Sequence, residues 1–333
     1  MIHELKHIVE KANQCFKNKE LCVLATVVAL DGTSYRKPGV RMLITKSGEM
    51  IGAVSGGCIE KDIAHRAQQV FKTGEPLVMA YDGRFRLGCE GTLYILIEPF
   101  VVNEELFTAF NNHLEKRQPL ELTSYFIKAD NATGAFGTQL ILDEKTYQFN
   151  SNTPLNFKLH TLNSKLQPCF KLLIIGAEHD AVKLCTIAAS MGWEVEVIST
   201  WRDPKTKIDF PEAKEVISIS PEMLEVEKID QNTAVVLMTH SYALDLKYLM
   251  QFQNATFAYL GVLGSRHRND QLRAELFEHS HDLEEIEFYG PIGLDIGAET
   301  PEEIAIAIIA EILSVIRNKT SNSLSTHKSS ISI

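Results

Sequence analysis

The chain has 333 residues and a formal net charge of −10, from 33 Lys and Arg against 43 Asp and Glu. This length suits two domains, each large enough to bury its own core. The acidic balance leaves no surplus of cations to neutralise nucleic acid or an anionic membrane, so we expect neither as a partner. No apolar run reaches membrane-spanning length, and the first residues lack the layout of a secretion signal, which favours a cytoplasmic location.

The six cysteines are scattered along the chain, without the paired spacing of a zinc site or the density of a disulfide framework. We therefore expect reduced thiols. Cys22 lies in an apolar run and Cys185 on the apolar face of a predicted helix, so we expect both to be buried. Cys58 and Cys89 differ, because glycines surround them.

The first half of the chain predicts an α/β domain over residues 1–160. Helices are expected at 4–18 and 59–72 and from residue 104, and strands at 21–29, 40–45, 50–54, 77–81, 92–99, 120–128 and 137–142. The turn at 46–49 predicts a hairpin. Residues 150–167 are rich in Asn, Ser and Thr, and we expect them to form the interdomain linker.

The second half, residues 168–318, alternates between predicted strands and helices. Strands are expected at 172–175, 194–198, 216–217, 234–238 and 257–260, and helices at 181–191, 244–253 and 304–316. This alternation predicts a Rossmann-like, doubly wound parallel sheet. Thr300 and Glu303 form a capping box before the last helix, which is apolar on nearly every side and which we expect to be buried. Residues 319–333 are expected to form a disordered tail.

The loop after the first of these strands lacks the dinucleotide fingerprint. Gly176 is present, but Glu178 stands where the second glycine would approach a diphosphate, and Asp180 adds another negative charge. The next strand offers no acid for a ribose until Asp203. The sequence therefore argues against NAD(P) in this loop.

In a doubly wound sheet, ligands bind beyond the carboxyl ends of the strands. Candidate binding residues follow the predicted strands there or precede the last helix: His240, Gly264, Ser265, Arg266 and Asp295. Glycine, hydroxyl and guanidinium groups at a helix start suit an oxyanion. Alternatively, the arginine is solvated and the histidine satisfies a loop carbonyl.

The candidate binding loop of the first half joins a predicted strand to a predicted helix: Ser55, Gly56, Gly57, Cys58 and Glu60. Free amides and the macrodipole at a helix start favour an anion and lower the pKa of a thiol, so Cys58 is a candidate thiolate. If the sheet brings the neighbouring loop close, Arg36, Lys37 and Arg41 would neutralise an anionic ligand. That loop could also be a plain surface turn.

Cys89, between Gly88 and Glu90, is the second candidate thiol. It could face Cys58 as a soft ligand or in a redox pair, or be an inert buried cysteine.

Long strings of the chain resemble the XdhC/CoxI family, the accessory proteins of molybdenum hydroxylases such as xanthine dehydrogenase. The similar strings are 32–39 and 52–60 in the first half, and 238–240, 261–266 and 291–305 in the second. The chain departs from the family pattern at Glu178 and Glu90, where glycines are common.

The resemblance implies a maturation factor rather than an enzyme with turnover of its own. Such a protein binds molybdenum cofactor (molybdopterin), holds it while a cysteine desulfurase supplies the sulfido ligand, and inserts it into the apo-hydroxylase. Cys58 would then be a transient molybdenum ligand or sulfur carrier, and the protein a homodimer. Two other interpretations stay open: an NAD(P)-dependent oxidoreductase built on the Rossmann-like domain, and a scaffold for the hydroxylase and desulfurase that binds no cofactor.

Overall fold

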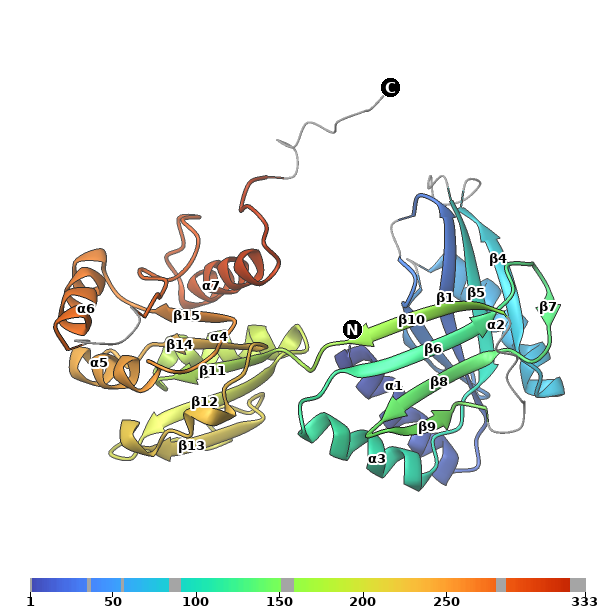
Figure 1. Cartoon of the computed structure of the whole chain (residues 1–333), viewed down its shortest axis with the longest axis horizontal. Coiled ribbons are helices and arrows are strands. Elements are labelled where there is room, and N and C mark those ends of the chain that lie inside the picture. Colours follow the sequence, from blue (N-terminus) through green and yellow to red (C-terminus); the bar gives the residue numbers. More distant parts are fainter. Residues whose placement is uncertain are drawn as a thin grey trace. The chain divides into compact units, whose positions relative to one another are not determined.

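The computed structural model describes residues 2–34, 37–54, 57–83, 91–150, 159–279 and 286–323. The chain divides into two compact units, Met1–Pro168 and Cys169–Ile333 (Figure 1). Both units mix helices and strands, as the sequence predicts. Most of the predicted tail, residues 324–333, lies outside the described residues.

The first unit contains two antiparallel sheets. Its helices are α1 (Ile2–Lys17), α2 (Cys58–Thr73) and α3 (Glu104–Glu115). Its strands are β1 (Cys22–Gly32), β2 (Arg41–Thr45), β3 (Met50–Gly52), β4 (Leu77–Asp82), β5 (Gly91–Pro99), β6 (Leu120–Phe126), β7 (Ala132–Thr133), β8 (Gly137–Leu142), β9 (Lys145–Gln148) and β10 (His160–Leu166). The six-stranded sheet has the order β3-β2-β1-β5-β4-β7 and the four-stranded sheet the order β10-β6-β8-β9. The predicted hairpin of β2 and β3 is confirmed.

The six-stranded sheet is covered on both faces. Alternate residues of a strand point to opposite faces of the sheet, and in β1 the residues on both faces are mostly apolar. Val27 packs with Ile63 of α2 on one face, while Val28 packs with Phe126 and Phe136 from the second sheet and its connection on the other. The sheet is therefore the middle layer of the first unit.

The predicted linker at 150–167 is wrong over residues 160–166. These residues form β10, which pairs antiparallel with β6 along its whole length. β10 is an edge strand whose residues are exposed or half-buried in alternation. An edge strand with one face in water keeps many polar residues, so its composition resembles that of a linker.

The second unit is a parallel sheet in the order β13-β12-β11-β14-β15. Its strands are β11 (Lys171–Ile175), β12 (Glu194–Thr200), β13 (Glu215–Ile219), β14 (Thr233–Leu237) and β15 (Tyr259–Val262). Its helices are α4 (His179–Ser190), α5 (Tyr242–Gln251), α6 (Arg266–His279) and α7 (Pro301–Ile316), with short 3-10 turns η2 (Pro221–Met223) and η3 (Val226–Lys228). All strand pairs are parallel, which confirms the predicted Rossmann-like sheet.

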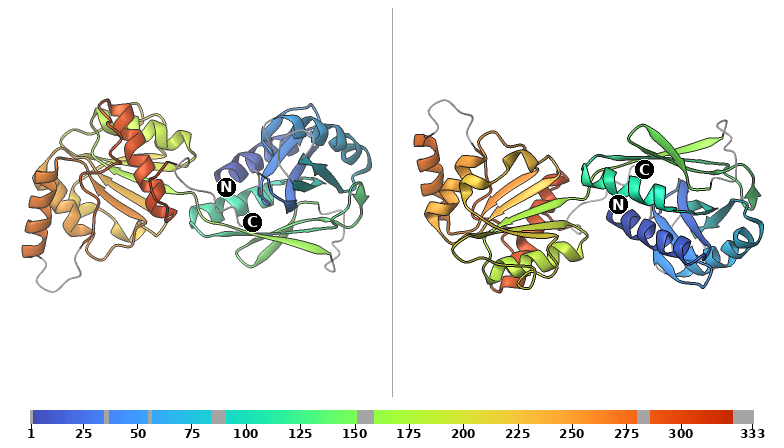
Figure 2. Two further views of the ribbon diagram at one scale, coloured as in Figure 1. Left: turned by 90° about the horizontal axis from the view of Figure 1, so that it is seen from above. Right: turned by 90° about the horizontal axis from the view of Figure 1, so that it is seen from below.

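Helices cover both faces of this sheet, as Figure 2 shows from above and below. Leu184 of α4 and Ile308 of α7 belong to one buried cluster, and Leu249 of α5 and Leu272 of α6 to the other. The capping box at the start of α7 is confirmed. The prediction that α7 is buried is wrong for one side of the helix, because Ile306 is 50% exposed.

Candidate functional site

Five strand termini of the six-stranded sheet lie at one edge. Gly32 at the end of β1 pairs with Gly91 at the start of β5, and Asp82 at the end of β4 pairs with Thr92. On the other side of β1, the start of β2 lies beside the end of β3. Segments 33–40 and 83–90 each connect two of these strand termini, and segment 53–57 leads from β3 to α2; we call this end of the sheet the loop edge.

At the loop edge, the neighbouring strands β1 and β5 lie close together around Gly91. A Cβ atom on Gly91 would lie 2.5 Å from the carbonyl oxygen of Thr33, so a larger residue would push the two strands apart. This close approach holds the exits of segments 33–40 and 83–90 side by side. These are the segments that carry the predicted cations and the second predicted cysteine.

Helix α2 starts at the loop edge, and Cys58 is its first residue. Gly57 is the N-cap with φ 121°, and its amide donates to Oε2 of Glu60 at 2.8 Å. Glu60, predicted as a binding residue, thus holds the start of the helix. Cys58 occupies the position where the helix macrodipole favours an anion.

Several predicted site residues lie outside the described residues: Arg36, Ser55, Gly56, Cys89 and the side chain of Cys58. Their roles stay predictions. Lys37 is exposed and lies in the segment between β1 and β2.

Arg41, which we expected to help neutralise an anionic ligand, is buried in β2 and not exposed in the loop. It is 7% exposed, on the face of β2 that also carries Leu43 and Thr45. Its Nη1 donates to the carbonyl of Gly39 at 2.9 Å, and burial lowers its pKa to about 10, partly offset by Glu98. The pairing register, which the sequence alone does not give, turns Arg41 inward.

Cys22 and Cys185 are buried, which confirms that prediction. Burial raises the pKa of Cys22 to about 12 and that of Cys185 to about 11, so both stay protonated at neutral pH. Cys15 and Cys169 are also buried and form no disulfide. These four thiols are unsuited to ligand chemistry, which leaves Cys58 and Cys89 as the candidates.

In the second unit, His240 follows β14, Ser265 and Arg266 follow β15, and Asp295 lies in the segment before α7. His240, Ser265, Arg266 and Asp295 are exposed. The hydroxyl of Ser265 accepts from the amide of Arg268 at 3.3 Å and so caps α6. The structure therefore gives Ser265 a capping role and leaves Arg266 in solvent.

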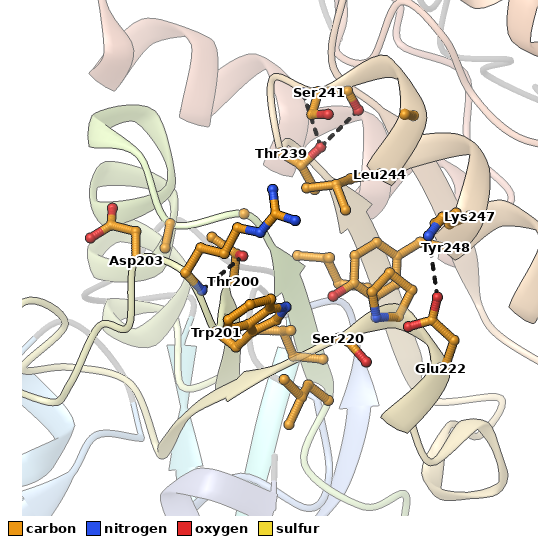
Figure 3. A pocket seen from close by; sticks show the side chains of 18 of the residues that line it. Thr200, Trp201, Asp203, Ser220, Glu222, Thr239, Ser241, Leu244, Lys247 and Tyr248 are labelled. Carbon is orange, nitrogen blue, oxygen red and sulfur yellow. Dashed lines mark hydrogen bonds and ion pairs between the residues drawn. The ribbon is translucent and has the colours of Figure 1, made fainter.

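A pocket of about 370 Å³ opens at the carboxyl ends of β11, β12, β13 and β14 (Figure 3). Gly176, Thr200, Ser220 and Thr239 mark the exits of the four strands. Trp201 lies across from Leu244 and Tyr248 of α5. We call this space the carboxyl-edge pocket.

The carboxyl-edge pocket contains none of the four exposed residues predicted above. Trp201 is a lining residue that the sequence does not predict. The available signal is an aromatic side chain directly after a strand, but only the strand order brings Trp201 opposite α5. Gly176 is needed here because a Cβ on it would lie 2.2 Å from the carbonyl oxygen of Met238.

Two features of other protein classes are missing from the described ranges. No helix there is long and apolar enough to cross a membrane. In the same ranges, no group of three or more His, Cys, Asp or Glu side chains could hold a metal ion.

The fold and the site define a class of two-unit proteins, with a cysteine-bearing α/β unit followed by a Rossmann-like unit. Residues 15–82 match the model of the XdhC and CoxI family, and residues 172–312 match that of the XdhC Rossmann domain.

Similar proteins cover nearly the whole chain. The chain is 31% identical over 324 residues to a Bacillus subtilis protein named as a probable subunit of xanthine dehydrogenase, covering 89% of this chain and 94% of that protein. It is 26% identical over 300 residues to the molybdenum cofactor insertion chaperone PaoD of Escherichia coli, covering 88% and 83%. A crystal structure described as a xanthine dehydrogenase from Bacillus halodurans superposes with a TM-score of 0.75 at 28% identity, covering 95% and 97%. The chain belongs to the XdhC and CoxI family.

Proposed function

We propose that this protein is an accessory factor that binds molybdenum cofactor and inserts it into a xanthine dehydrogenase-type molybdenum hydroxylase. Two relatives support the proposal, one named as a molybdenum cofactor insertion chaperone and the other as a probable subunit of xanthine dehydrogenase. The cofactor is cargo here, since the protein passes it on.

The observation that carries the proposal is the position of Cys58. It is the first residue of α2, at the edge from which segments 33–40 and 83–90 also leave the sheet. Molybdopterin offers a phosphate and a dithiolene-bound metal, which suit helix amides and a soft thiolate ligand. We propose that Cys58 contacts the metal or carries the sulfur destined for it, with Cys89 nearby.

The finer parts of the proposal concern assembly. We propose that a cysteine desulfurase docks on the accessory factor while the cofactor is held, that the factor is a homodimer, and that it acts in the cytoplasm. The family resemblance supports these parts.

The test compares the parent with Cys58→Ala, both purified from a host that makes the cofactor. We expect the parent to carry pterin, seen as fluorescence after denaturation and oxidation, and to activate the apo-hydroxylase. We expect Cys58→Ala to lose most of both, since alanine keeps the helix start but removes the thiol.

Cys185→Ala is the matched control, because it removes a thiol buried in the second unit. It should keep pterin and activation. Parent protein without pterin and without effect on the hydroxylase would contradict the proposed function, and a fully active Cys58→Ala would contradict the role of the thiol.

A further inference from the structure

We propose that the carboxyl-edge pocket binds a planar nitrogen heterocycle, of the nucleoside or pterin type, stacked on Trp201 and carrying no diphosphate. This inference goes beyond the proposed function, because it concerns the second unit and does not depend on the thiol of Cys58.

The size and walls of the pocket suit such a ligand. Its volume of about 370 Å³ falls in the range of small-molecule sites, which are mostly apolar with a few polar groups. Ile175, Ile198, Leu244 and Tyr248 supply the apolar lining. The lining combines a buried floor with polar groups at the strand exits.

Trp201 is the structural reason to expect an aromatic ligand. Its side chain is 61% exposed, although it directly follows β12 and lines the pocket. The guanidinium of Arg202 lies 5.3 Å from the centroid of its ring, a cation–π contact that helps hold the indole. A large indole held at a pocket wall offers a stacking surface for a heterocycle.

The charges of the pocket disfavour a diphosphate. Its lining includes the carboxylates Glu178, Asp203 and Glu222 and the cations Arg202 and Lys247. Lys247 pairs with Glu222 at 3.3 Å (Figure 3). The lining thus has no surplus of positive charge to neutralise a diphosphate.

The same carboxylates suit the edge of a heterocycle. Amino groups of purines and pterins donate hydrogen bonds, and so do sugar hydroxyls, while ionised carboxylates only accept. Glu178 caps α4 through its backbone, and its side chain makes no capping bond. Asp203, which pairs with Lys205 at 2.7 Å, lies at the end of the pocket that follows β12. We therefore assign the polar edge of the ligand to Glu178 and Asp203.

The experiment uses the tryptophan content of the chain. There are two tryptophans, Trp193 and Trp201, and Trp193 packs edge-on against Phe170 at 4.8 Å. In the full-length Trp193→Phe variant, tryptophan emission reports on Trp201 alone. We would titrate this variant with adenosine, guanosine, neopterin, AMP and NAD⁺, and repeat each titration by calorimetry on the parent chain.

We expect saturable quenching by at least one of adenosine, guanosine and neopterin, and weaker binding of AMP and NAD⁺. The arms distinguish a nucleoside from a pterin. Trp201→Ala, followed by calorimetry, should raise the Kd by about tenfold or more. Ile208→Ala, which trims a side chain that is 90% exposed and outside the pocket lining, should leave the Kd unchanged.

Three results would overturn the inference: no quenching by any of the three neutral compounds, an unchanged Kd in Trp201→Ala, or NAD⁺ binding as tightly as the tightest of the three neutral compounds. This test of the pocket and the test of the proposed function can fail independently of each other. Cys58→Ala should bind the heterocycle like the parent, and Trp201→Ala leaves the loop edge of the first unit intact.

Discussion

At the scale of single residues, the first unit contains a buried carboxylate, Glu98, whose burial is not predicted from the sequence. Glu98 of β5 is fully buried and accepts from the amide of Thr138 at 2.9 Å and from its hydroxyl at 2.6 Å. Burial raises the pKa of Glu98 to about 7, against the opposing effects of Thr138 and Arg41. Glu98 therefore binds a proton in the folded state at pH values where the unfolded chain has lost it.

This difference predicts how stability depends on pH. Between about pH 4.5 and 7 the folded protein holds one more proton at Glu98 than the unfolded chain. Its free energy of unfolding should therefore fall as pH rises, by up to ~1.4 kcal/mol per pH unit from this group. Glu98→Gln lacks this titrating group, so the variant should lose less stability than the parent as pH rises from 5 to 7. Urea unfolding at several pH values measures the free energy of unfolding of both proteins.

Glu121→Gln is the control for this prediction, since Glu121 is an exposed residue of β6 whose carboxylate pairs with Lys165. Its stability difference from the parent should change little over the same pH range. Parallel profiles for Glu98→Gln and the parent would show that Glu98 titrates normally.

At the scale of elements, α7 starts with a complete capping box. The hydroxyl of Thr300 accepts from the amide of Glu303 at 3.3 Å, and Oε2 of Glu303 accepts from the amide of Thr300 at 3.0 Å. Pro301 occupies the first turn, where its missing N–H costs nothing. These contacts fix where the helix that covers one face of the parallel sheet begins.

We expect Thr300→Ala to lower the free energy of unfolding of the second unit by about 1 kcal/mol, the usual cost of losing such a cap. Chemical unfolding followed by circular dichroism measures the change. Thr320→Ala, at an exposed position beyond the end of α7, should have no effect. Equal stability of the two variants would refute the contribution of the cap.

The elements also show what a sequence can and cannot predict. Strands such as β11 and β14, buried at every position, are predictable to within a residue or two, because continuous apolar runs are a strong signal. Helix α6 is not predicted, since it buries few apolar side chains, among them Leu272 and Leu276. Local glycines predict the start of α2 at Cys58, whereas the carboxyl-edge pocket depends on strand order. The sequence thus predicts features that depend on neighbouring residues, but it does not predict which distant residues the strand order brings together.

At the scale of the whole molecule, each unit has its own core. Ile63 belongs to a cluster within Met1–Pro168, and Ile308 to a cluster within Cys169–Ile333. Units with separate cores unfold as separate cooperative transitions.

Ile63→Ala should therefore destabilise the first unit by about 2–5 kcal/mol, the cost of a cavity in a packed core, and leave the transition of the second unit in place. Ile308→Ala is the reciprocal control. Scanning calorimetry of the full chain measures both transitions, and thermal unfolding followed by tryptophan fluorescence reports on the second unit, which contains both Trp193 and Trp201. Equal shifts of both transitions by either variant would mean that the units unfold as one.

The loop edge suggests how members of this family can differ in sequence while they keep the same sheet. Segments 33–40, 53–57 and 83–90 are each tethered to strand termini of one covered sheet. Val54 of segment 53–57 is fully buried in the same cluster as Val27 and Ile63, so an exchange of the segments has to keep Val54. The three segments thus form a cassette, and transplanting all of them together into a relative should carry over client preference while the recipient keeps its melting temperature.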